Sequence, residues 1–256
     1  DTSEINLTRP HQQVQGAGPM DSDARRGSFL HPLQAFTLDG LPLGSVWQKA
    51  WARTQIETEL SKDEKNQKRT QTPIEEKESI RWIEGLRAAR EVAKACPATT
   101  CVCVGDSESD IYELFSEPRE IDRPNQQVHL LTRACQTRAT TDQSNWLAKV
   151  RKSKCLYECT VNVSARKAQI APSRQRKRSR SRDARIAQVE VRATTVTLRP
   201  PWRHDRKLPE LTVNVVLVEE TNPPDGCEAI QWLLVTTLPI DQPEQIKRIV
   251  QAYCIR

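Results

Sequence analysis

A single aspartate, Asp106, follows a short apolar run near the middle of the chain. Residues 102–104 predict a buried strand, Gly105 ends it, and residues 107–115 predict a helix because their apolar residues recur at helical spacing. Ligands and metals bind at the carboxyl ends of strands in open α/β sheets, so Asp106 is a candidate catalytic or metal-binding carboxylate. The alternative is that Asp106 only caps the following helix, since Asp is a favoured N-cap residue.

A second stretch, residues 165–185, could bind phosphates. It contains nine Lys or Arg residues and one Asp. A run of like charge repels itself and does not fold alone, but it supplies phosphate contacts on a nucleic acid. The net charge of +6 also favours a polyanionic partner. The alternative is a solvated loop without a partner. The basic side chains that carry the nucleic-acid hypothesis are Arg174, Arg176, Lys177, Arg178 and Arg180.

The cysteines do not follow the spacing of a metal site or a disulfide framework. The chain has eight of them, and no pair of Cys-x-x-Cys motifs is present. A structural zinc site is therefore disfavoured. We expect reduced, mostly buried thiols, as in a cytosolic protein.

The elements that must position Asp106 are predicted by periodicity and turn signals. Two apolar-rich runs around Asp39-Gly40 predict a β-hairpin over residues 26–53, after a polar loop. Residues 54–72 predict a solvated loop or a frayed helix, and a helix should begin at Pro73 and end at Cys96. With the strand at 102–104, the following helix and a strand at 128–136, this order predicts an α/β layer fold with a mixed sheet.

The second half of the chain is richer in β-branched residues. Alternating patterns predict an antiparallel β insertion with strands at 155–164, 187–200 and 211–220, followed by a strand at 231–240. Residues 241–256 predict an amphipathic helix with Ile246, Ile249, Val250 and Tyr253 on one face. No apolar run reaches the roughly 20 residues that a membrane-spanning helix needs.

Seven strings, in order along the whole chain, resemble one family. They are DTSEINLTRP, LDGLPLG, EKESIRW, VGDSESDIYELF, EETNPPDG, WLLVTTLPI and IVQAYCIR. Together they resemble bacterial insertion-sequence DDE transposases of the IS-four family, which carry a Tyr-Arg-Glu-Lys signature. The resemblance implies a ribonuclease-H-like mixed sheet with flanking helices and an antiparallel β insertion. It divides the chain into a core at 1–140, the insertion at 141–238 and the start of the last core helix at 239–256.

The resemblance also implies a two-metal site. Asp1 matches the first and Asp106 the second of three carboxylates that hold Mg²⁺ or Mn²⁺ in this family. Tyr253 and Arg256 match the first two members of the signature, whose Glu would fall four residues after Arg256. The third carboxylate is therefore missing here, and we expect a truncated fragment that is nearly inactive alone in hydrolysis and strand transfer.

The remaining contacts implied by the resemblance are to double-stranded DNA, both transposon ends and target. Arg133, Tyr253 and Arg256 would bind phosphates near the cut, and Trp232 would fill the gap left by a flipped base. The alternatives are surface salt bridges for the first three and a buried strand tryptophan for Trp232. The family resemblance further implies a homodimer in the bacterial cytoplasm, at the nucleoid. The alternative function is a non-catalytic, basic nucleic-acid-binding protein.

Overall fold

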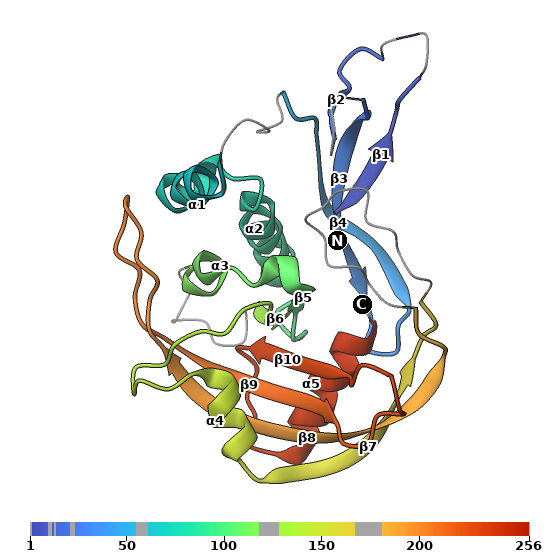
Figure 1. Ribbon diagram of the computed structural model, residues 1–256, viewed down its shortest axis with the longest axis vertical. Coiled ribbons are helices and arrows are strands. Elements are labelled where there is room, and N and C mark those ends of the chain that lie inside the picture. The colour runs from blue at the N-terminus through green and yellow to red at the C-terminus, as the bar shows by residue number, and fades with distance from the viewer. Residues whose placement is uncertain are drawn as a thin grey trace. The chain divides into compact units, whose positions relative to one another are not determined.

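The computed structural model describes residues 2–9, 12, 14–20, 24–54, 61–117, 128–166 and 181–255 (Figure 1). The chain divides into two compact units. The first unit comprises Asp1–His129, Pro200–Pro209 and Cys254–Arg256, and the second comprises Leu130–Arg199 and Glu210–Tyr253. The predicted boundaries at residues 140 and 238 stay predictions.

The first unit contains a small antiparallel sheet. Its strands are β1 (Ser3–Asn6), β2 (Gly18–Pro19), β3 (Arg26–Phe36) and β4 (Pro42–Trp51), in the order β1-β3-β2 with β4 also paired to β3. The predicted hairpin is confirmed, and Gly40 occupies its turn with a φ of +84°. The predicted polar loop before residue 26 is wrong in part, because β1 and β2 pair with β3. All four residues of β1 are exposed, and the sequence of this strand has no apolar alternation from which it could be predicted.

The helices of the first unit begin later than the sequence predicts. A 3₁₀ turn, η1 (Ile74–Glu76), is followed by Lys77 in an extended conformation, and α2 (Ile80–Ala95) begins only after it. Helix α2 buries Ile83 and Leu86. The helix that precedes η1 and α2 in the chain is α1 (Lys62–Gln71). It has a capping box, in which the side chain of Ser61 accepts the backbone N–H of Glu64 and the side chain of Glu64 accepts that of Ser61. Of the two alternatives for this stretch, the helical one is therefore confirmed for residues 62–71.

The larger sheet is mixed and has six strands. Their order is β5-β6-β10-β9-β8-β7. The bounds are Val102–Gly105 for β5, His129–Arg133 for β6, Cys155–Val163 for β7, Arg185–Leu198 for β8, Leu211–Glu220 for β9 and Gln231–Thr236 for β10. Within the second unit every neighbouring pair is antiparallel. The predicted α/β class is confirmed, and the strands predicted in the second half of the chain are present.

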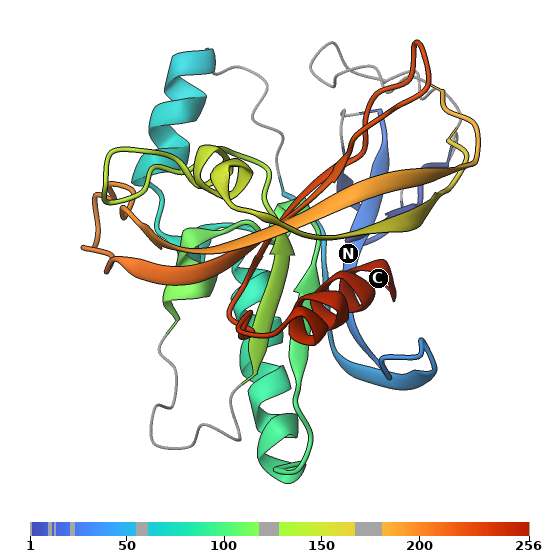
Figure 2. The ribbon, with the colours of Figure 1, turned by 90° about the horizontal axis from the view of Figure 1, so that it is seen from below.

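Two helices cover opposite faces of the sheet in the second unit, α4 (Trp146–Lys152) and α5 (Pro243–Ile255) (Figure 2). On the α4 side, Arg151 pairs with Glu219 at 2.5 Å. On the α5 side, the Trp232 ring lies 5.5 Å from that of Tyr253. The face predicted for the last helix is confirmed, since its buried residues are Ile246, Ile249, Val250 and Tyr253. Helix α4 was not predicted, although Asn145 caps it by accepting the Ala148 N–H at 2.9 Å.

All eight cysteines lie in the described part of the chain and none forms a disulfide. The expected reduced state stays a prediction. The expectation that most thiols are buried is wrong, because four cysteines are exposed and four are half-buried. Among the described residues, no helix is long and apolar enough to cross a membrane.

Candidate functional site

Asp106 lies directly after β5 and shapes the turn that follows. Its Oδ1 accepts the Glu108 N–H at 2.8 Å, and its carbonyl oxygen accepts the Ser109 hydroxyl at 2.7 Å. These side-chain bonds stabilise the start of a short 3₁₀ helix, η2 (Ser107–Ser109), and α3 (Tyr112–Ser116) begins separately. The prediction of one helix over 107–115 is therefore wrong, whereas the proposed capping role of Asp106 is confirmed.

The residue before Asp106 must be glycine because the turn folds back on it. A Cβ atom on Gly105 would lie 2.3 Å from Ser109 Oγ and 3.0 Å from the Trp82 ring. No side chain fits at these distances without moving the turn or the indole. The close packing holds Asp106 at a defined position between β5 and η2.

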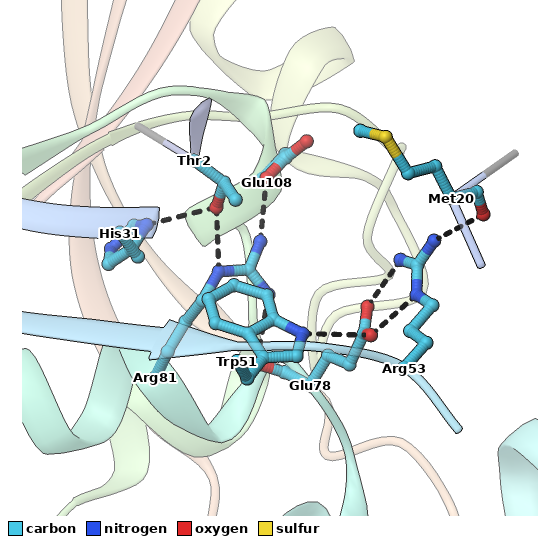
Figure 3. Close-up of polar contacts among 8 residues, drawn as sticks. All are labelled: Thr2, Met20, His31, Trp51, Arg53, Glu78, Arg81 and Glu108. Atoms are coloured by element: carbon cyan, nitrogen blue, oxygen red, sulfur yellow. Dashed lines mark hydrogen bonds and ion pairs between the residues drawn. The ribbon is translucent and has the colours of Figure 1, made fainter. Parts of the chain in front are cut away.

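A buried arginine of α2 connects this turn to the N-terminal segment (Figure 3). Arg81 is only 8% exposed. Its Nε donates to Thr2 Oγ1 at 2.9 Å, and its Nη2 donates to Glu108 Oε2 at 2.7 Å. Its Nη1 donates to the Glu78 carbonyl oxygen at 2.9 Å. A planar guanidinium with several fixed N–H donors suits such a three-way junction.

The Thr2 hydroxyl also forms a hydrogen bond with a buried histidine. Thr2 Oγ1 lies 3.0 Å from His31 Nδ1. Arg81 Nε donates to the same hydroxyl, so Thr2 Oγ1 joins the guanidinium and the imidazole. Burial, the largest cause, and nearby positive charge, including Arg81, together lower the pKa of His31 to about 4. His31 is therefore neutral at physiological pH.

A stack of aromatic and guanidinium groups immobilises Arg81 from its other side. The Phe29 and Trp51 rings stack at 5.4 Å, and the Arg81 guanidinium lies 5.5 Å from the Trp51 ring centroid. The Glu78 carboxylate accepts from Trp51 Nε1 at 3.0 Å and from Arg53 at 2.6 Å. Burial alone would raise the pKa of Glu78, but the bonds from Arg53 and Trp51 hold it below its usual value. We call Thr2, His31, Arg81 and Glu108 the Arg81 junction.

Three residues predicted to contact DNA lie on one face of the second unit. Arg133 is directly opposite Leu234 in the β6–β10 pair, and Trp232 is two residues before Leu234 on the same strand. Residues opposite each other, and residues two apart on one strand, point to the same side of a sheet. The third residue, Tyr253, packs against Trp232 on that side. Trp232 is half-buried, whereas Tyr253 is buried at 6% exposure.

The ends of the basic stretch are held by backbone pairing. Arg166 and Arg182 exchange N–H···O bonds of 2.8 and 2.9 Å, and Arg182 Nε donates to the Ser164 carbonyl at 3.0 Å. Arg185 forms an ion pair with the buried Glu220. Arg185 therefore serves the fold of the second unit. The five basic residues predicted to bind DNA, Arg174, Arg176, Lys177, Arg178 and Arg180, lie outside the described residues, as do Asp1 and Arg256.

The Arg81 junction was missed by sequence reasoning. Its members are up to 106 positions apart and no local pattern links them, although three strings of the family resemblance contain Thr2, Arg81 and Glu108. In the described ranges no three His, Cys, Asp or Glu side chains gather as a metal-binding group. No protein-family model matches the sequence.

Proposed function

We propose that the chain is the catalytic core of a DNA transposase of the DDE type, with Asp1 and Asp106 as two of its metal-binding carboxylates. One observation carries the proposal. The Arg81 guanidinium binds both Thr2, the covalent neighbour of Asp1, and Glu108, two residues after Asp106. A single side chain therefore connects the two segments in which the family resemblance places the first two carboxylates.

The residue types fit a magnesium site. Mg²⁺ prefers carboxylate and water oxygens, and Asp106 presents its carboxylate at the end of β5. A carboxylate has about four lone-pair sites, so accepting the Glu108 N–H is compatible with ligating a metal. In such a site, Mg²⁺ would polarise the scissile phosphate and lower the pKa of a bound water.

Residues outside the metal site would bind the DNA. Arg133 and Trp232 share a sheet face with Tyr253 in the second unit. An arginine fork binds phosphate oxygens, and an indole can stack on an unpaired base. The basic stretch at 165–185 would add sequence-independent phosphate contacts that weaken as salt increases.

Asp106→Asn tests the proposal without removing the cap. Asn is as good an N-cap residue as Asp, so η2 should persist, whereas a neutral amide is a poor ligand for a hard divalent cation. We expect the purified chain to bind Mn²⁺ in a titration followed by electron paramagnetic resonance. Asp106→Asn should weaken that binding by about tenfold or more, on the order of a lost metal contact.

The matched control is Asp39→Asn in the exposed hairpin turn, which changes the net charge equally and should leave Mn²⁺ binding intact. Equal Mn²⁺ affinity for Asp106→Asn and the unmodified chain would show that Asp106 only caps the turn. If salt-sensitive DNA binding persisted in that case, the chain would be a basic nucleic-acid-binding protein without a metal site.

A further inference from the structure

The loop between β8 and β9 presents a tryptophan to solvent. Trp202 lies in this loop, whose residues 200–209 belong to the first unit, and it is 68% exposed. Tryptophan is highly buried on average, because its large ring gains free energy on leaving water. Single exposed apolar residues are common on protein surfaces, so exposure alone indicates no function. Two further features of this loop, its fixed backbone and its basic side chains, do indicate one.

The backbone at Trp202 is held on both sides. Two prolines, residues 200–201, come directly before it and fix their own φ angles. Directly after it, Arg203 forms an ion pair of 2.5 Å with the buried carboxylate of Glu113 in α3. The same guanidinium donates from Nη1 to the Trp202 carbonyl oxygen at 3.2 Å. The indole therefore extends from a fixed point of the first unit.

The rest of the loop is attached to the same unit. Arg206 Nη2 donates to the Glu75 carboxylate of η1 at 2.6 Å. The Tyr112 hydroxyl of α3 donates to the Pro209 carbonyl oxygen at 2.8 Å, and Leu208 is buried. A ring that is already held in place loses little conformational entropy when a ligand packs against it, so Trp202 is preorganised for binding.

Basic side chains accompany the exposed ring. The His204 ring meets the Trp202 ring edge-on, with 6.2 Å between the ring centroids. Lys207 is exposed and has no ion-pair partner among the described residues. The three carboxylates that contact the loop's two arginines are each neutralised by those contacts. The loop thus offers a flat aromatic face together with uncompensated positive charge.

We propose that Trp202 is a stacking site for an unpaired base of single-stranded DNA, with Lys207 contacting the phosphate backbone. A base has a flat π-face for the indole, and its phosphates complement the charge of the loop. In a duplex the base faces are covered by their neighbours, so the ligand is an unpaired base. The inference rests on the proposed function for its DNA ligand, and it adds a contact outside the residues to which the family resemblance assigns DNA binding.

Two substitutions of Trp202 separate stacking from general apolar contact. The probe is a fluorescein-labelled oligo-dT of about 12 nucleotides, and binding to the whole chain is followed by fluorescence anisotropy in the presence of EDTA. Trp202→Leu should weaken binding about 5- to 100-fold, the effect of losing one stacked base, whereas Trp202→Phe keeps a flat ring and should retain most of the affinity. Both variants should fold, because the replaced side chain is exposed.

The matched control is Leu43→Ala on the β3–β4 hairpin. Leu43 is an apolar side chain of the same unit with a similar exposure of 64%, and its removal should leave oligo-dT affinity unchanged. Equal affinities of Trp202→Leu and Leu43→Ala would refute the stacking site. An equal loss in Trp202→Leu and Trp202→Phe would refute it as well, because the flat ring would then contribute nothing.

The salt dependence tests the two contacts separately. Stacking releases no counterions, so Trp202→Leu should lower the affinity by the same factor at low and at moderate salt. Lys207→Gln should reduce the slope of log affinity against log salt by about 0.7, the value for one phosphate contact on a single strand. An unchanged slope in Lys207→Gln would refute the phosphate contact.

The Mn²⁺ titration keeps the two proposals apart. If Asp106→Asn leaves Mn²⁺ affinity unchanged while Trp202→Leu weakens oligo-dT binding, the metal site is refuted and the stacking site stands. If Asp106→Asn weakens Mn²⁺ binding while Trp202→Leu binds oligo-dT as tightly as the unmodified chain, the metal site stands and the stacking site is refuted.

Discussion

Acid should destabilise the first unit through its buried histidine. His31 is 3% exposed, its ring meets that of Trp82 edge-on at 4.4 Å, and burial together with nearby positive charge lowers its pKa to about 4. In the unfolded chain a histidine titrates near its ordinary value of 6.5. As the pH falls below 6.5, the unfolded state therefore binds a proton that the folded state excludes, and the free energy of unfolding decreases.

The size of the effect follows from the two pKa values. Their difference corresponds to at most about 3 kcal/mol of stability, lost fully once the pH is below about 4. Between about pH 7 and pH 5 the loss should be about 2 kcal/mol, because the unfolded histidine is almost fully protonated at the lower pH and the folded one is not. Above pH 6.5 the contribution of His31 to the free energy of unfolding is present in full.

Urea unfolding at several pH values, followed by tryptophan fluorescence, measures this loss. His31→Asn removes the titrating ring. The free energy of unfolding of this variant should therefore fall by about 2 kcal/mol less than that of the unmodified chain over the same pH range. His204→Asn, at an exposed histidine, should behave like the unmodified chain. Carboxylates that titrate in this range are common to all three proteins and cancel in the comparison.

An equal pH dependence in the unmodified chain and in His31→Asn would contradict the reasoning. It would mean that the folded protein accommodates the imidazolium despite the neighbouring Arg81.

Two further predictions concern stability. Glu220→Ala should lower the free energy of unfolding by about 3–5 kcal/mol in urea titrations, because it leaves the partly buried Arg185 without its carboxylate. The control, Glu244→Ala, removes an exposed pair with Lys247 and should change the free energy of unfolding little; equal effects of the two substitutions would contradict the argument from burial. Ser61→Ala removes the capping box of α1 and should cost this helix about 1 kcal/mol, seen as faster amide hydrogen exchange within α1 alone; unchanged exchange would refute the cap's role.

The elements predicted correctly are those whose signal is local. The hairpin around Gly40 follows from a turn dipeptide between apolar runs, and the buried face of α5 follows from helical spacing. The position of Asp106 after a strand was also readable, since a short apolar run ended by glycine is a local pattern.

The elements that were missed or misplaced depend on partners distant in sequence. Strand β1 has no buried residue and exists because its backbone pairs with β3. The predicted helix after Asp106 is broken because Gly105 allows Ser109 to fold back against β5, which no helical periodicity could show. Helix α4 is short, and Asn145 before it was its one clear start signal.

The sequence by itself determined the α/β class, the strand that ends at Asp106, and the amphipathic last helix, because these follow from the spacing of apolar residues along the chain. Only the tertiary structure decided that Arg81 lies between Thr2 and Glu108. The physical reason is that a buried guanidinium must find acceptors wherever the fold places them, and three-dimensional packing brings together groups 79 and 27 positions away from it in the sequence.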